Sequence, residues 1–343
     1  MFKTTAGYFF LQLSITGLVI NLGALTLLRR MMKKGDPQFV YLIAIIAILN
    51  DTINLVVNCC YFAPTIIASH YILADTVNAL GPMIMTSLVQ FSWYNGLFIM
   101  LLMVTNRMAY LVLDNTEIFT TLRIVLFFIF SCLLSCSKIL IGIFVIPCCV
   151  LFLDNEKYGY AVFNPRNQTD WNMFIDSCIS LAVFIVTSLC YLLVRQNSSS
   201  NEKANIQIYV SIRNSKENET ETTNSRDQQK KTERERSAAI QFAYVSLYYM
   251  ITYASLRVTP LIFGERLESN MITPVIYALE NCANGCVFMF VNKEVKDHIY
   301  KKIFKNNVVH SQAAGDGSPN NPNANPTPAA DNPEYMMWNQ NFA

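Results

Sequence analysis

Charged residues are scarce in this chain of 343 residues. Asp, Glu, Lys and Arg make up 15% of the sequence, against roughly 25% in ordinary globular proteins, while hydrophobic residues make up 52%. Sixteen of the charged residues lie in one segment, 195–236, so the rest of the chain is poorer still. This composition argues against a soluble protein, and the formal net charge of +2 gives no case for nucleic-acid binding.

Histidine is also scarce, with three residues, and the ten cysteines form neither a CxxC pair nor a Cys/His cluster. We therefore expect no metal site and no cofactor. No pairing of a nucleophile with a base stands out, so an enzyme is not predicted. Two adjacent cysteine pairs, Cys59 with Cys60 and Cys148 with Cys149, fall at the same expected side of a membrane. A bridge between them and buried free thiols are both open.

What the chain does have is long apolar stretches. Seven of them reach the length of about 20 residues that a helix needs to cross a bilayer: 7–28, 39–61, 83–105, 124–146, 173–194, 237–263 and 271–291. Chains inside hydrocarbon must satisfy their backbone polar groups internally, which favours helices. The sequence predicts an all-α membrane protein with a seven-transmembrane helix bundle.

Basic residues predict the orientation of the bundle. With the N-terminus outside, twenty Lys and Arg residues fall inside and five fall outside or at the outer edge. The third inner loop, 195–236, is rich in polar residues and we expect it to be flexible. Residues 292–305 have the spacing of an amphipathic helix on the inner membrane surface, although a solvated helical extension fits too, and 306–343 has the composition of a disordered tail.

The same topology places the sequon Asn167-Gln168-Thr169 in the second outer loop. Asn167 is therefore the candidate glycosylation site, with an unused sequon as the alternative.

Short motifs at the span ends resemble those of a known receptor family. Val104-Thr105-Asn106-Arg107-Met108 resembles the Asp-Arg-Tyr triplet of rhodopsin-like receptors, and more closely the Asn-Arg-Phe form of nematode serpentine chemoreceptors. The segments Ala283-Asn284-Gly285-Cys286-Val287-Phe288 and Phe290-Val291-Asn292-Lys293-Glu294-Val295-Lys296 are similar to the seventh-span ending of class X of that family. Ile118-Phe119-Thr120 and Leu49-Asn50-Asp51 fit the same pattern.

The chain also departs from the rhodopsin-like pattern. No Cys lies between Asp75 and Gln90, the seventh span lacks Asn-Pro-x-x-Tyr, and Pro260 in the sixth span has no Cys-Trp before it. These gaps put the standard activation switches of rhodopsin-like receptors in doubt for this chain.

The resemblance implies a role in G-protein coupling for Asn106 and Arg107. In the family this Arg is restrained at rest and meets the G protein on activation. Since Asn106 is not acidic, our hypothesis is that Arg107 pairs at rest with Glu233 or Glu235 at the foot of the sixth span. The alternative is that Arg107 has no role in activation and is simply one of the basic residues on the inner side of the membrane.

Asp51 is an ionisable residue in the middle of a predicted span, a position that is costly and usually faces the bundle interior. We expect a polar core of Asn21, Asp51, Asn281 and Asn284, with Asn54 as a further partner. A hydrated core that rearranges on activation, with or without a sodium ion, and a purely structural hydrogen-bond cluster are both open.

Polar and aromatic residues in the outer halves of the spans are candidates for a ligand site, because ligand pockets in bundles lie between helices. The candidates are Gln90, Trp93, Tyr94, Asp176, Tyr253, Arg257, Tyr277 and Glu280. Lys138 has three open assignments: a pair with an acid across the bundle, an anionic ligand, or a side chain that extends towards the membrane surface.

The resemblance implies a chemosensory G-protein-coupled receptor that binds a small molecule and signals to a heterotrimeric G protein. The expected partners are therefore that G protein, a small-molecule ligand and the lipid bilayer. The expected location is the plasma membrane, including sensory-neuron cilia. The alternative is a transporter or ligand-gated channel, against which the odd number of spans and the lack of evident repeats both argue.

Overall fold

The computed structural model describes residues 2–32, 39–74, 76, 79–111, 119–145, 150–154, 159–163, 171, 174–190, 192–193, 196, 244–255, 262, 267–290 and 295–296. At a few of these positions, Arg107 among them, only the backbone is described.

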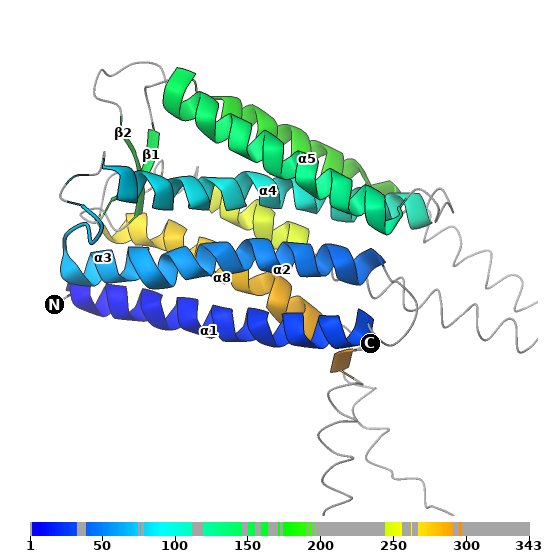
Figure 1. The fold of residues 1–343 in the computed structure, drawn as a ribbon, viewed down its shortest axis with the longest axis horizontal. Helices are drawn as coiled ribbons and strands as arrows, with labels where there is room; N and C mark the ends of the chain where they lie inside the picture. The colour runs from blue at the N-terminus through cyan, green and yellow to red at the C-terminus, as the bar shows by residue number, and fades with distance from the viewer. Residues whose placement is uncertain are drawn as a thin grey trace, which may run out of the picture. The chain divides into compact units, whose positions relative to one another are not determined.

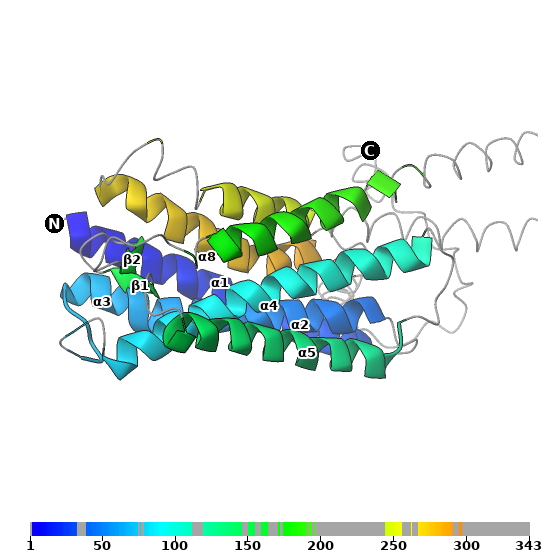
Figure 2. The ribbon, with the colours of Figure 1, turned by 90° about the horizontal axis from the view of Figure 1, so that it is seen from above.

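Seven helices pack lengthwise against one another in the part of the chain that the structure describes (Figures 1 and 2). The first helix is α1 (Phe2–Met32), and the second is built from α2 (Phe39–Val57), the π-helical turn η1 (Asn58–Phe62) and α3 (Ala63–Ala68). They are followed by α4 (Leu80–Leu111), by α5 (Thr121–Leu140) with the π-helical turn η2 (Ile141–Val145), by the helix Phe174–Cys190, by the helix 244–255 and by α8 (Leu267–Phe290).

Four of the described helices are long and apolar enough to cross a membrane: Thr4–Met32, Tyr41–Ala68, Leu80–Asn106 and Thr121–Val145. The helix Phe174–Cys190 is apolar but shorter within the described residues. Each of the four is long enough for the roughly 30 Å of hydrocarbon in a bilayer, at 1.5 Å of rise per residue.

Helix packing places the core along the middle of the bundle. Helix α1 contacts α2, α3 and α8, and α4 contacts both α2 and α5. Ile43, Ile48 and Ile99 are fully buried there, whereas Leu126, Phe130 and Leu133 of α5 are exposed on the outside. A helix that is apolar on its exposed face as well as on its buried face suits a lipid environment rather than water.

A two-stranded hairpin adds to the predicted helices. Strand β1 (Val150–Asp154) pairs antiparallel with β2 (Gly159–Phe163), in a register from Val150↔Phe163 to Asp154↔Gly159. Strand β1 contacts α4 and β2 contacts α8, at the end of the bundle where α1 begins and α3 lies (Figures 1 and 2). The hairpin was not predicted, because a search for apolar runs of membrane length passes over five-residue strands in a connecting segment.

Several predictions concern segments that the structure describes only in part. Cys59 and Cys60 are free thiols, while Cys148 and Cys149 lie outside the described residues. The sequon at Asn167, most of the loop 195–236 and the tail 306–343 lie outside them too. Of the expected surface helix 292–305, only Val295 and Lys296 are described, and both are helical.

Close packing of α1 depends on small residues. A Cβ atom added at Gly17 would collide with the Sγ atom of Cys282 on α8 and would lie 3.0 Å from Leu55 on α2. A Cβ atom added at Gly23 would meet only Met289, at 3.7 Å and beyond, which is an ordinary contact distance.

We therefore expect Gly17→Ala to lower the melting temperature of the purified protein, since overpacking costs about 1–3 kcal/mol. Gly23→Ala is the matched control and should leave the melting temperature unchanged or raise it, because Ala favours helix over Gly by about 1 kcal/mol. Thermal unfolding in detergent measures both. Equal melting temperatures for the two variants would contradict the packing described for α1.

Candidate functional site

Amide side chains join the helices in the middle of the bundle. Asn50 of α2 donates from Nδ2 to the backbone carbonyl of Ser92 on α4 at 2.9 Å, and the Ser92 hydroxyl donates to the backbone carbonyl of Asn50 at 2.9 Å. Asn95 donates from Nδ2 to the Asn50 Oδ1 atom at 2.9 Å, and Ser131 of α5 donates to the Asn95 Oδ1 atom at 2.5 Å. These direct bonds link α2, α4 and α5.

Asn54, one helical turn after Asn50 on α2, extends the network to α8. The Nδ2 atom of Asn54 lies 2.7 Å from the Ser92 hydroxyl, 2.6 Å from the Tyr277 hydroxyl and 3.1 Å from the Asn281 Oδ1 atom, so these three acceptors share its two N–H groups. Asn281 in turn donates from Nδ2 to the backbone carbonyl of Tyr277 at 2.6 Å. One buried amide therefore holds α2 against both α4 and α8.

The four residues predicted as a polar core come together on α1, α2 and α8. Asn284 donates from Nδ2 to the Asp51 Oδ2 atom at 2.6 Å, and Asn21 donates from Nδ2 to the backbone carbonyl of Asn281 at 3.1 Å. All four side chains are buried. Asn50, Ser92 and Asn95 belong to the same network and were not among the predicted residues. Their signal in the sequence is an Asn or Ser in the middle of an apolar run, the same feature that drew attention to Asp51.

Glu280 is a second buried acid in this region, with 2% of its surface exposed. The groups that act on its carboxylate are the charge of Asp51 and the side chain of Tyr249. The described residues contain no cluster of three or more His, Cys, Asp or Glu side chains of the kind that holds a metal ion.

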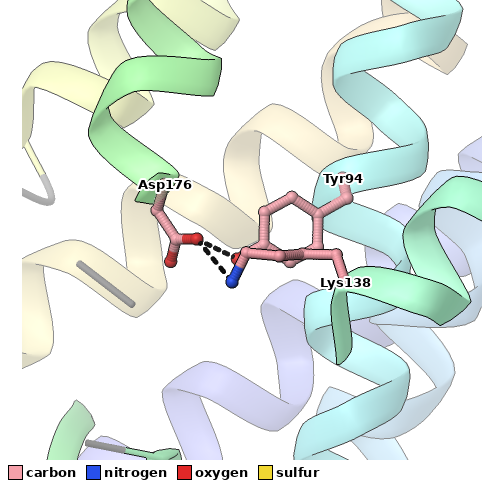
Figure 3. Close-up of polar contacts among 3 residues, drawn as sticks. All are labelled: Tyr94, Lys138 and Asp176. Carbon is pink, nitrogen blue, oxygen red and sulfur yellow. Dashed lines mark hydrogen bonds and ion pairs between the residues drawn. The ribbon is translucent and has the colours of Figure 1, made fainter. Parts of the chain in front are cut away.

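A second polar group lies nearer the hairpin and joins α4, α5 and the helix Phe174–Cys190 (Figure 3). The Tyr94 hydroxyl donates to the Asp176 Oδ1 atom at 2.5 Å, and the Lys138 Nζ atom lies 3.0 Å from the same oxygen. The ammonium group of Lys138 also lies 5.3 Å from the centre of the Tyr94 ring, within the range of a cation–π interaction. Three assignments were left open for Lys138, and the structure shows the first of them, an ion pair with an acid on another helix, Asp176.

Aromatic rings pack together around Tyr277 of α8. Trp93 of α4 packs edge-on against Tyr277, with ring centroids 5.6 Å apart, and at 6.5 Å from the Tyr249 ring. Gln90 and Tyr253, two further ligand candidates, are half-buried, and Tyr253 makes other contacts. Arg257 lies outside the described residues. Of the eight candidates, Trp93 and Tyr277 thus contact each other directly, as do Tyr94 and Asp176.

The predicted coupling residues are described only in part. Asn106 is buried near the end of α4, and Arg107 follows it in the same helix without a described side chain. Glu233 and Glu235 lie outside the described residues. The pair between Arg107 and one of these acids therefore stays a prediction.

Comparison with known proteins decides what this bundle is. Residues 11–292 match the serpentine type 7TM GPCR chemoreceptor Srx family. The chain belongs to this Srx family of chemoreceptors. It is a seven-transmembrane G-protein-coupled receptor, as its motifs near Arg107 and Asn284 indicated, and the transporter or channel alternative falls away.

The fold of the Srx receptor is similar to that of squid rhodopsin in its crystal structure. The TM-score is 0.68, the sequences are 15% identical, and the match covers 92% of each chain. At this identity the likeness concerns the fold alone, and it confirms the predicted seven-helix bundle. No curated protein matches the chain.

In the Srx receptor the contacts of Lys138 allow a direct test. Removing one charge of a partly buried pair leaves the other without its partner, which costs more than removing both. We expect Lys138→Met and Asp176→Asn each to lower the melting temperature. The double variant should recover part of the loss, with a coupling energy of about 1–3 kcal/mol. Thermal unfolding of the four proteins measures this cycle, and strictly additive losses would contradict a direct interaction.

Proposed function

We propose that this Srx receptor binds a small molecule between the helix ends nearest the hairpin and signals to a heterotrimeric G protein at the opposite end. The ligand site is supported by the positions of the candidate ligand residues. Trp93 and Tyr94 lie on α4 and Tyr277 lies on α8, which are the two helices that the strands of the hairpin contact. Partly buried aromatic and polar groups together are typical of small-molecule sites.

The same proposal gives the receptor its orientation and place. The N-terminus and the hairpin lie outside the cell, the excess of basic residues lies inside, and Asn167 carries the glycan. The receptor functions in the plasma membrane, including that of sensory cilia. It carries out no chemical reaction on its ligand.

The polar core is the proposed connection between the two ends. Asn54 contacts Tyr277 on the ligand side, and Asn281 and Asn284 continue along α8 from there to Asp51. Two helices can slide or rotate only if these hydrogen bonds exchange partners. A ligand that binds one arrangement better than the other shifts the balance between them.

At the other end we propose that Arg107 contacts the G protein in the active state. Arg107→Ala should abolish ligand-evoked second-messenger signalling in cells that express the receptor, while surface expression and ligand binding to the purified receptor persist. Arg123→Ala, on the exposed surface at the start of α5, is the matched control and should signal normally. Full signalling by Arg107→Ala would refute this role.

We further propose that Glu233 or Glu235 restrains Arg107 at rest. Since exposed ion pairs contribute about 0–1 kcal/mol, Glu233→Gln or Glu235→Gln should raise basal signalling by up to about fivefold. Glu219→Gln, earlier in the same loop and farther from the sixth span, removes a charge from the same segment and should leave basal signalling unchanged. Unchanged basal activity in both test variants would sink the proposal.

A further inference from the structure

Three buried polar side chains lie without partners where α2 continues into α3. Asn58, Tyr61 and Thr65 are 1%, 2% and 1% exposed. The two amide atoms of Asn58 and the hydroxyls of Tyr61 and Thr65 form no hydrogen bond with any described residue. These residues are absent from the polar core described above and from the predicted ligand candidates.

Unpaired polar groups that are buried are costly, because they give up hydrogen bonds to water without replacing them. Helical Thr residues usually avoid the cost by donating to the carbonyl four residues earlier. Thr16, Thr26 and Thr52 do so, at 2.8, 2.8 and 2.6 Å. The hydroxyl of Thr65 does not, although its backbone is also helical.

The backbone at this place is also irregular. Asn58–Phe62 forms the π-helical turn η1 inside an otherwise α-helical span, and Ser69, directly after the end of α3, has the left-handed conformation. π-Helical turns are rare, and they occur frequently at functional sites. Neither end of η1 is capped by a side-chain hydrogen bond that would account for it.

Tyr61 lies in an apolar cluster that includes two proposed ligand residues. Its other members include Phe10, Phe62, Val89 and Tyr277, and Trp93 packs against it. Phe10 and Phe62 meet edge to face, with ring centroids 5.0 Å apart. Tyr61, with its unpaired hydroxyl, thus belongs to the same cluster as two of the proposed ligand residues.

We propose that Asn58, Tyr61 and Thr65 are the hydrogen-bonding part of the ligand site, and that the ligand is an uncharged, largely apolar molecule with a hydroxyl or amide group. This inference rests on the proposed function and names the chemical class of its ligand. The three side chains offer one N–H donor group, one carbonyl acceptor and two hydroxyls that both donate and accept. A neutral hydroxyl or amide complements this set, whereas a carboxylate or ammonium would be buried among groups that carry no opposite charge.

The test uses purified receptor in lipid nanodiscs and a series of probes with the same alkyl chain: 1-octanol, octanamide, octanoate, octylamine and octane. Thermal unfolding is measured for the native chain, Tyr61→Phe and Thr65→Val. Tyr8→Phe and Thr16→Val are the matched controls, since Tyr8 and Thr16 are exposed on α1.

We expect 1-octanol and octanamide to raise the melting temperature of the native receptor more than octane, octanoate or octylamine do. Tyr61→Phe and Thr65→Val should lose this additional rise, and the control variants should keep it. Without a probe, both test variants should unfold at the native temperature or above it, because each removes an unpaired polar atom.

Three results would overturn the inference: no preference for the neutral polar probes, a preference that persists in both test variants, or a lower melting temperature of both without any probe. The last result would mean that the hydroxyls have stabilising partners. The assay contains no G protein, so a receptor that binds the probes but does not signal contradicts the coupling proposal alone. A receptor whose signalling ligands are charged contradicts the inference alone.

Discussion

The pairing of amide side chains inside the bilayer is the constraint on which the rest of this bundle depends. Lipid offers no hydrogen bonds, so a buried Asn can gain them only from another helix or from its own backbone. The two reciprocal bonds between Asn50 and Ser92 fix the rotation of α2 against α4. The bonds from Asn284 to Asp51 and from Asn21 to Asn281 fix α8 against α2 and α1 in the same way. Apolar packing alone, with similar side chains on every face, would leave these rotations poorly defined.

Not every hydrogen-bonding atom in this amide network has a partner among the described residues, and this imbalance suits a receptor that changes conformation. The Nδ2 groups of Asn21, Asn54 and Asn284 are all engaged, while their Oδ1 atoms accept no hydrogen bond from a described residue. An excess of acceptors means that a donor can change partner without leaving another donor unpaired. Packed interfaces with two alternative sets of contacts are the elements through which small changes at one site reach another. The Tyr94–Asp176–Lys138 group, by contrast, ties three helices through a single carboxylate oxygen.

Much of this structure can be predicted from the sequence because the bilayer simplifies the problem. Apolar runs of fixed length predict the bundle, and the Asn-Arg and Asn-Gly motifs predict the receptor family. A residue such as Asp51 attracts attention simply because a charge in that position is expensive. The partner of Lys138 could not be chosen in advance, since Asp176 is 38 positions away and the choice depends on how two helices rotate. Asn58, Tyr61 and Thr65 were missed for the same reason: a list of polar residues in a span does not tell which of them lack a partner.

The π-helical turn η1 has a consequence for how this receptor is compared with its relatives. A π-turn accommodates one more residue than an α-turn, so it behaves as a single-residue insertion that the helix absorbs without a break. Positions of α2 before Asn58, Asp51 included, correspond to those of a relative whose second helix lacks the turn. Positions after Phe62 are displaced by one residue. An alignment without gaps would pair the wrong side chains in α3, while the residues of α2 before Asn58 would still be paired correctly.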